Sequence, residues 1–174
     1  QPFNPVRDDV VWRLSPGLSY ESGRHALISG KLAYVENIDI YQDNSDLDAA
    51  LSNVTFTAQH DDGASKTSVG ASYRQFNQNT VNLRLPGLSR RDETAANVNH
   101  EMELSAKSSL MFGVTWKDID YSRATLTDRT TVTLPLRYYW EATPKVDLSF
   151  GGQYRRNDTD LAFSSSDDIL LNVG

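Results

Sequence analysis

Apolar and polar residues alternate along several separate stretches of this chain. In the clearest stretch, 131–141, the even positions carry Val132, Leu134, Leu136, Tyr138 and Trp140, and most odd positions carry Thr, Arg or Glu. A period of two is typical of a β-strand whose two faces meet different surroundings. One proline inside the stretch departs from the pattern, because proline cannot donate a hydrogen bond to a neighbouring strand.

The same alternation predicts further strands on both sides of this one. The predicted strands cover residues 10–20, 26–35, 53–59, 68–74, 97–104, 110–117, 131–141 and 145–155, and a ninth begins near residue 168. No segment has a convincing helical period. The sequence therefore predicts an all-β chain.

The connections between the predicted strands alternate in length. Short ones follow Tyr20, His60, Ser105 and Glu141, and long polar ones fall near residues 39–49, 77–95, 118–129 and 157–167. Outer-membrane barrels have short periplasmic turns and long extracellular loops. The sequence therefore predicts an antiparallel up-and-down transmembrane β-barrel in a bacterial outer membrane.

Aromatic residues provide an independent test of this prediction. If the short turns are periplasmic, five aromatic side chains of the apolar face fall near the extracellular end and two near the periplasmic end. Such rings prefer the level of the lipid headgroups. The predicted membrane-interface residues are Trp12, Tyr34, Tyr73, Trp116 and Tyr154 at one level and Tyr20 and Trp140 at the other.

The direction of the strands predicts that these nine do not form a whole barrel. The first strand runs downward, so residues 1–9 would lie outside the cell, whereas a mature barrel normally begins in the periplasm. Single-chain bacterial barrels also have even strand numbers, and an open sheet edge is unsatisfied in lipid. We therefore expect residues 1–174 to be one segment of about eight or nine strands, incomplete at both ends, within a larger barrel.

Composition excludes several other classes. No apolar run approaches the roughly 20 residues of a membrane-spanning helix, and residues 1–5 do not resemble a signal peptide. The absence of cysteine excludes disulfides and cysteine metal sites. A net charge of −6 argues against a nucleic-acid partner.

Short motifs resemble a known family. The run from Asp8 to Leu18 resembles the Asp-x-x-x-x-x-Ser-Pro-Gly-Leu segment of the β-barrel porin 2 family, as do the Tyr-rich strand ends and the turn Thr143-Pro144-Lys145. The long loop that carries Leu83 to Leu88 matches no pattern of that family. The resemblance implies an outer-membrane barrel associated with exopolysaccharide export.

Candidate chemistry is sparse. His25 and His60 fall at short turns and His100 on an apolar strand face, without a serine and a carboxylate placed for acyl transfer, so we expect no catalytic residue and no cofactor. The long connections are acidic. Their carboxylates are simplest to explain as solvated loop residues, and the alternative is divalent-cation bridging to lipopolysaccharide. These carboxylates are Asp39, Asp43, Asp46, Asp48, Asp118, Asp120, Asp128, Asp158, Asp160, Asp167 and Asp168.

The polar strand positions carry charges that cannot face hydrocarbon cheaply, so they are expected to line a hydrated lumen. Either they set selectivity for a polar or anionic solute, or they pair across strands and hold the wall together. The predicted lumen-facing residues are Arg13, Lys31, Arg74, Glu101, Glu103, Lys117, Arg137, Glu141, Lys145, Asp147 and Arg155. A loop with Arg84, Arg90 and Arg91 is predicted to be an ordinary extracellular loop, with a constriction or a partner contact as alternatives.

These features predict a passive channel or conduit for polar solutes that performs no covalent chemistry, with outer-membrane lipid and lipopolysaccharide as surroundings. Three alternatives remain open. One is a scaffold barrel that encloses an electron-transfer or export partner. Another is a secreted soluble all-β binding module, whose apolar face would pack against a second sheet. The third is an outer-membrane enzyme, which would need His60 or His100 beside a serine and a carboxylate.

Overall fold

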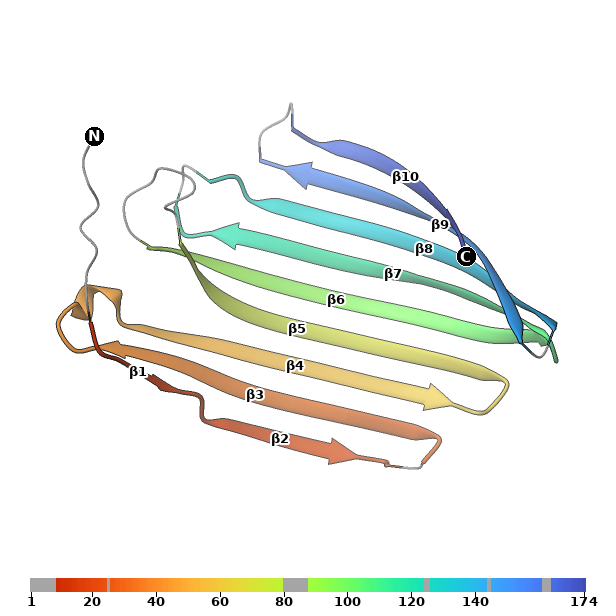
Figure 1. Cartoon of the computed structure of the whole chain (residues 1–174), viewed down its shortest axis with the longest axis horizontal. Coiled ribbons are helices and arrows are strands. Elements are labelled where there is room, and N and C mark those ends of the chain that lie inside the picture. The colour runs from red at the N-terminus through yellow and green to blue at the C-terminus, as the bar shows by residue number, and fades with distance from the viewer. Residues whose placement is uncertain (1–8, 25, 80–87, 124–125, 144, 161–163) are drawn as a thin grey trace.

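Consecutive strands lie side by side in one curved antiparallel sheet in the computed structural model (Figure 1). The structure describes residues 9–24, 26–79, 88–123, 126–143, 145–160 and 164–174. Its strands follow the order β1-β3-β4-β5-β6-β7-β8-β9-β10, and β2 also pairs with β3. The predicted all-β, antiparallel up-and-down architecture is therefore confirmed, and the two edges of the sheet do not meet.

The strand bounds match the predicted order. The strands are β1 (Val11–Leu14), β2 (Gly17–Ser22), β3 (Ile28–Tyr41), β4 (Ala49–Asp61), β5 (Ser65–Asn79), β6 (Leu88–Ser105), β7 (Ser108–Tyr121), β8 (Arg129–Thr143), β9 (Val146–Thr159) and β10 (Ser166–Val173). A single 3-10 turn, η1 (Ser45–Leu47), interrupts the described connections. The described part of the chain contains no helix long and apolar enough to cross a membrane.

The first predicted strand is present in two pieces. β1 and β2 both pair with β3, and Ser15 and Pro16 separate them. Pro16 has no N–H to donate, but its carbonyl still accepts the backbone N–H of Glu36 at 2.9 Å. Ten strands therefore occupy nine positions across the sheet, which agrees with the nine strands expected from the sequence.

The long connections are shorter than the sequence suggests, and this part of the prediction was wrong. Pairing between β5 and β6 continues to Asn79 opposite Leu88, well inside the stretch predicted to be a loop. β7 and β8 likewise extend to Tyr121 and back from Arg129. Polar residues such as Gln75, Asp92 and Asp118 stand at the apolar-face positions of these strand ends, so the alternation on which the prediction depended is lost there, although the backbones still pair.

Proline leaves a local mark on β8. Pro135 pairs with Gln153 of β9 on one side. On the other side the β7–β8 register passes from Phe112 opposite Leu136 directly to Thr115 opposite Thr133. The missing N–H thus weakens one ladder locally without ending the strand.

The sheet is a single layer without a core of its own. Among the described residues, Ile119 is the one buried hydrophobic side chain, at 4% exposure, and Ser89 is the one buried polar side chain. Many large apolar side chains are exposed instead, including Trp12 at 63% and Leu171 at 83%. Within the described chain, no second layer covers either face.

The short turns step regularly along the strands, at the right of Figure 1. Residues that pair directly from strand to strand form a row across the sheet. One such row starts at Ser22, beside the first short turn, and passes through Ala58 of β4 to Val114 of β7. Ala58 lies three residues before Asp61 at the second turn, and Val114 lies six residues after Ser108 at the third. Each hairpin therefore shifts the turn by three residues along the strands.

This stagger determines how far the strands must tilt for all the short turns to lie in one plane. Three residues span about 10 Å along a strand, and two strand spacings also span about 10 Å. If all the short turns lie in one plane, the strands are therefore inclined by about 45° to the line perpendicular to that plane. Strands of membrane barrels are inclined by about 35–45°.

Candidate functional site

One face of the sheet is apolar across all nine strand positions. Directly paired residues share a face, so the register extends this apolar face from strand to strand. Trp116 pairs with Val132, and Leu134 with Tyr154, which pairs in turn with Ile169 of the edge strand. We call this surface the apolar face and the opposite surface the polar face.

All seven predicted interface aromatics lie on the apolar face, and three of them lie at the same level. Tyr73, Trp116 and Tyr154 are each the ninth residue of their strands, counted from the short turn. A membrane-spanning strand tilted by about 45° needs about 9–11 residues. Tyr20 and Trp140 lie close to the short turns, so the two aromatic levels bracket an apolar band (hereafter the apolar band).

The apolar band ends sharply beyond the upper aromatic level. Two residues further along the same three strands, the apolar face carries Gln75, Asp118 and Arg156. Several upper-level phenols donate hydrogen bonds to carboxylates just beyond them, and Tyr73 donates to Asp92 at 2.8 Å. The same type of pair joins Tyr34 to Glu36 at 2.6 Å and Tyr154 to Asp167 at 3.1 Å. Ring and hydroxyl thus face different surroundings, as expected at a boundary between lipid and water.

The polar face carries ten of the eleven residues predicted to line a lumen. The register places Arg13, Lys31, Arg74, Glu101, Glu103, Lys117, Arg137, Glu141, Asp147 and Arg155 there. Lys145 instead lies in the turn between β8 and β9, where it is exposed. The assignment of these residues to a water-filled lumen stays a prediction.

Eight further charged residues of the polar face were missed by the sequence analysis. They are Glu21, Asp39, Asp61, Lys66, Arg91, Glu93, Arg129 and Asp168. Most lie at strand ends, where the opposite face is polar too. Extending the period of two outward from the apolar positions would have assigned them to the polar face.

The polar face is predominantly acidic near the short turns. Within five residues of a short turn, the described polar-face positions carry six carboxylates against Lys31 and Lys66. The six carboxylates are Glu21, Asp61, Glu101, Glu103, Glu141 and Asp147. We call this region the acidic rim.

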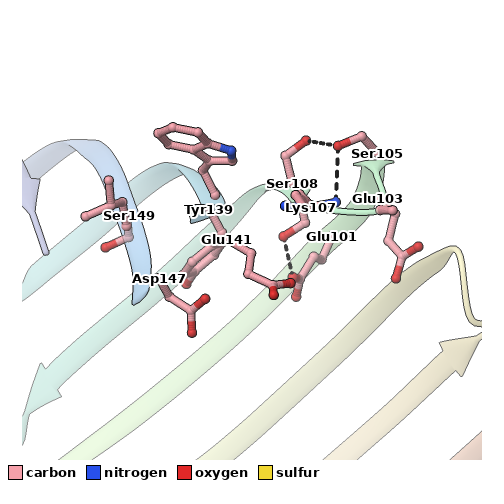
Figure 2. A pocket seen from close by; sticks show the side chains of 13 residues that line it. Glu101, Glu103, Ser105, Lys107, Ser108, Tyr139, Glu141, Asp147 and Ser149 are labelled. Carbon is pink, nitrogen blue, oxygen red and sulfur yellow. Dashed lines mark hydrogen bonds between the residues drawn. The ribbon is translucent and has the colours of Figure 1, made fainter. Parts of the chain in front are cut away.

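Four of the rim carboxylates line one open hollow of about 490 Å³ at the β6–β7 and β8–β9 turns. Figure 2 shows Glu101, Glu103, Glu141 and Asp147 projecting to the same side of the sheet. Ser109 donates its hydroxyl to Glu101 at 3.0 Å. The hollow is therefore an acidic recess in the sheet, which Lys107 and the hydroxyl groups of Ser105, Ser108 and Ser109 also line.

The rest of the polar face is predominantly basic. Beyond the acidic rim, the described polar-face strand positions carry seven cations against Asp39, Glu93 and Asp168. The seven cations are Arg13, Arg74, Arg91, Lys117, Arg129, Arg137 and Arg155. We call this region the basic zone.

The most closely packed part of the basic zone lies on β5, β6 and β7. Lys117 forms an ion pair with Glu93 at 2.9 Å, and an Arg91 nitrogen lies 3.7 Å from the same carboxylate. The Arg91 guanidinium also stacks 4.8 Å above the ring of Phe76. Some polar-face charges therefore do pair across strands. Cross-strand pairing was one of the two roles that the sequence analysis considered for them.

Uncharged polar side chains fill the middle of the polar face. One paired row runs through Thr57, Gly70, Asn97, Thr115 and Thr133. Their hydroxyl and amide groups both donate and accept hydrogen bonds. This part of the polar face therefore carries hydrogen-bonding groups without formal charge.

The described histidines lie on the apolar face. His100 shares a hydrogen bond with the Thr67 hydroxyl at 2.8 Å and packs against Phe112 with ring centroids 5.3 Å apart. His25 and Arg84 lie outside the described residues, and Arg90 lies in β6. The described part of the chain contains no group of three or more His, Cys, Asp or Glu residues that could hold a metal ion.

Comparison with solved structures places this architecture among known folds. The chain is similar to the outer membrane channel DcaP of Acinetobacter baumannii, with a TM-score of 0.65 and 14% sequence identity. The fold is similar to that of an outer-membrane channel. The match covers 97% of this chain and 52% of that one, so this chain spans about half the length of the channel.

Sequence comparisons add no family to this structural likeness. No family model matches the sequence, and no curated protein matches it at a significant level. The likeness to an outer-membrane channel is therefore supported by the fold, whereas the assignment to the β-barrel porin 2 family stays a prediction.

Proposed function

We propose that this chain forms part of the wall of a passive outer-membrane channel for polar solutes. The observation that carries the proposal is a single-layer sheet with one continuous apolar face and one charged face. In water such a sheet would expose its apolar face, and each large side chain moved into an apolar environment gains about 1.5–3 kcal/mol. A lipid bilayer on one side and water on the other satisfy both faces.

The membrane levels follow from the same geometry. The apolar band ends at the ninth residue of β5, β7 and β9, close to the length that a tilted strand needs to cross a bilayer. Outer-membrane lipid would contact the apolar band, and lipopolysaccharide headgroups would lie at the level of the carboxylates beyond Tyr34, Tyr73 and Tyr154. The localisation that we propose is therefore the bacterial outer membrane.

Closure of the wall requires more strands than the nine positions described. β1 and β10 both run from the long-connection end toward the short-turn end, because an odd number of positions separates them in an antiparallel order. Direct pairing of these two edges would be parallel. An antiparallel closed wall therefore needs an odd number of additional strands between the edges, in line with the larger barrel expected from the sequence.

Polysaccharide is the second candidate solute. The row of Thr and Asn side chains across the middle of the polar face offers donors and acceptors without strong charge. Hydroxyl-rich chains can exchange hydrogen bonds with such groups, which agrees with the export role implied by the family resemblance. A scaffold barrel would instead have its polar face covered by a partner protein.

Two measurements test the channel function. The protein, together with the strands that close its wall, is folded into detergent or lipid, and its electrophoretic migration is compared with and without heating. Single-channel conductance is then measured in planar bilayers, with polysaccharide added as a blocker. We expect heat-modifiable migration and stepwise conductance. A monodisperse monomer that is soluble without detergent would exclude the membrane wall, and a folded membrane protein without conductance would favour the scaffold.

A further inference from the structure

Charge on the polar face is balanced in total but separated along the strands. The described polar-face strand positions carry nine carboxylates and nine cations. Six of the carboxylates lie in the acidic rim and seven of the cations in the basic zone. Since every hairpin has its short turn at the same end, this separation lies along the axis of the wall.

Each zone favours a different ion in the solution beside it. Fixed carboxylates attract cations and repel anions, whereas fixed Arg and Lys side chains do the opposite. A channel with both zones in series therefore has a cation-enriched mouth at the short turns and an anion-enriched stretch toward the long connections. Neither zone alone describes the permeability of the whole path.

We propose that this axial separation makes the channel pass ionic current more easily in one direction than in the other. The proposal rests on the channel function proposed above. Its carriers are Glu103 and Glu141 on the rim side and Arg74 and Arg129 on the other side. All four lie on the polar face, and none belongs to the Lys117–Glu93 ion pair.

The favoured direction follows from the order of the zones. When the solution at the short turns is positive, cations enter through the acidic rim and anions enter through the basic zone. Both ions then accumulate where the zones meet, and the current rises. With the opposite voltage, each zone blocks the ion that would have to enter through it, so the junction is depleted and the current falls.

Charges outside the strands have less influence on this asymmetry. Lys107 and Lys145 lie in short turns, and Asp43 and Asp160 lie in long connections. Lys145, Asp43 and Asp160 are exposed to solution, where ions screen them over about 10 Å at about 0.1 M salt, whereas Lys107 lines the same hollow as four rim carboxylates and offsets one of their charges. Wall charges face the confined solution and act on every permeating ion.

The first experiment measures current against voltage in planar bilayers for the protein together with the strands that close its wall. We expect larger current when the short-turn side is positive at about 0.1 M salt, and a nearly symmetric curve at about 1 M, where screening extends only about 3 Å. Orientation is assigned with Ala106→Cys in the β6–β7 turn, because residues 1–174 contain no other cysteine for a membrane-impermeant thiol reagent.

Charge removal then identifies the carriers. Glu103→Gln/Glu141→Gln should bring the current ratio toward one and move the reversal potential in a salt gradient toward anion preference. The matched control Asp43→Asn/Asp160→Asn removes the same charge from the long connections and should leave the ratio unchanged. If the rim variant does not fold, Arg74→Gln/Arg129→Gln should also lower the ratio, with a shift toward cation preference.

The outcomes separate the two proposals. A folded protein without any conductance contradicts the channel function itself. A conducting protein with a symmetric curve at low salt, or with asymmetry that persists unchanged in both wall variants, contradicts the axial charge mechanism and leaves the channel function in place.

Discussion

Val114 offers a direct test of which face of the sheet meets lipid. It is the seventh residue of β7, it lies on the apolar face opposite Val98, and it is 39% exposed. The next residue, Thr115, lies on the polar face between Asn97 and Thr133. Val114→Arg and Thr115→Arg therefore place the same charge at the same height on opposite faces.

The expected costs differ because only one arginine would be placed in hydrocarbon. An arginine near the bilayer midplane on the lipid face of a barrel costs about 2–4 kcal/mol, which corresponds to about a 30- to 700-fold loss in the folding equilibrium. Thr115→Arg should change the free energy of unfolding by no more than about 0.5 kcal/mol, as a substitution at a hydrated site does. Leu104→Arg, two residues before the third short turn, should cost about 0–1 kcal/mol because it lies at the proposed membrane boundary.

Urea titration of the three variants in lipid vesicles measures these costs, with tryptophan fluorescence and heat-modifiable migration as independent signals of folding. The expected order of destabilisation is Val114→Arg, then Leu104→Arg, then Thr115→Arg. Equal costs at Val114 and Thr115 would refute the assignment of the two faces. A large cost at Val114 in a variant that folds without lipid or detergent would point to a second sheet packed on the apolar face.

Three further predictions concern the turns and the membrane boundary. Gly23→Ala should destabilise the protein more than Gly63→Ala in urea titrations: both glycines have positive φ, at 73° and 86°, but only at Gly23 would the added Cβ overlap the backbone of the following strand. Backbone N–H groups three and two residues ahead lower the pKa of Asp62, so this carboxylate stabilises the turn above its unfolded pKa and the contribution is lost as pH falls through the folded value. Asp62→Ala should thus lower the urea midpoint at pH 7 and not at strongly acidic pH, and an equal loss at both would contradict this linkage. Single-tryptophan variants that retain Trp116 or Trp140 should be quenched more by lipids brominated near the headgroup than by lipids brominated near the chain ends, and the reverse order would contradict the proposed boundary.

The central part of each strand could be predicted from sequence because apolar and polar positions alternate there. The segment 131–141 lies within β8, and Trp140 and Tyr154 lie on the face to which the alternation assigned them. Strand ends could not be predicted in the same way. The apolar face of β5 and β6 becomes polar near Gln75 and Asp92, so the alternation is lost there although backbone pairing continues.

The sequence by itself determined the strand order, the apolar face and the positions of the short turns, because these depend on local alternation and on turn residues such as Gly23 and Gly63. Tertiary structure decided which residues lie opposite one another, and with them the three-residue stagger of the hairpins and the level shared by Tyr73, Trp116 and Tyr154. It also decided that acidic and basic residues occupy different ends of the polar face. Register relates residues that are far apart in the chain, and a local pattern contains no information about that pairing.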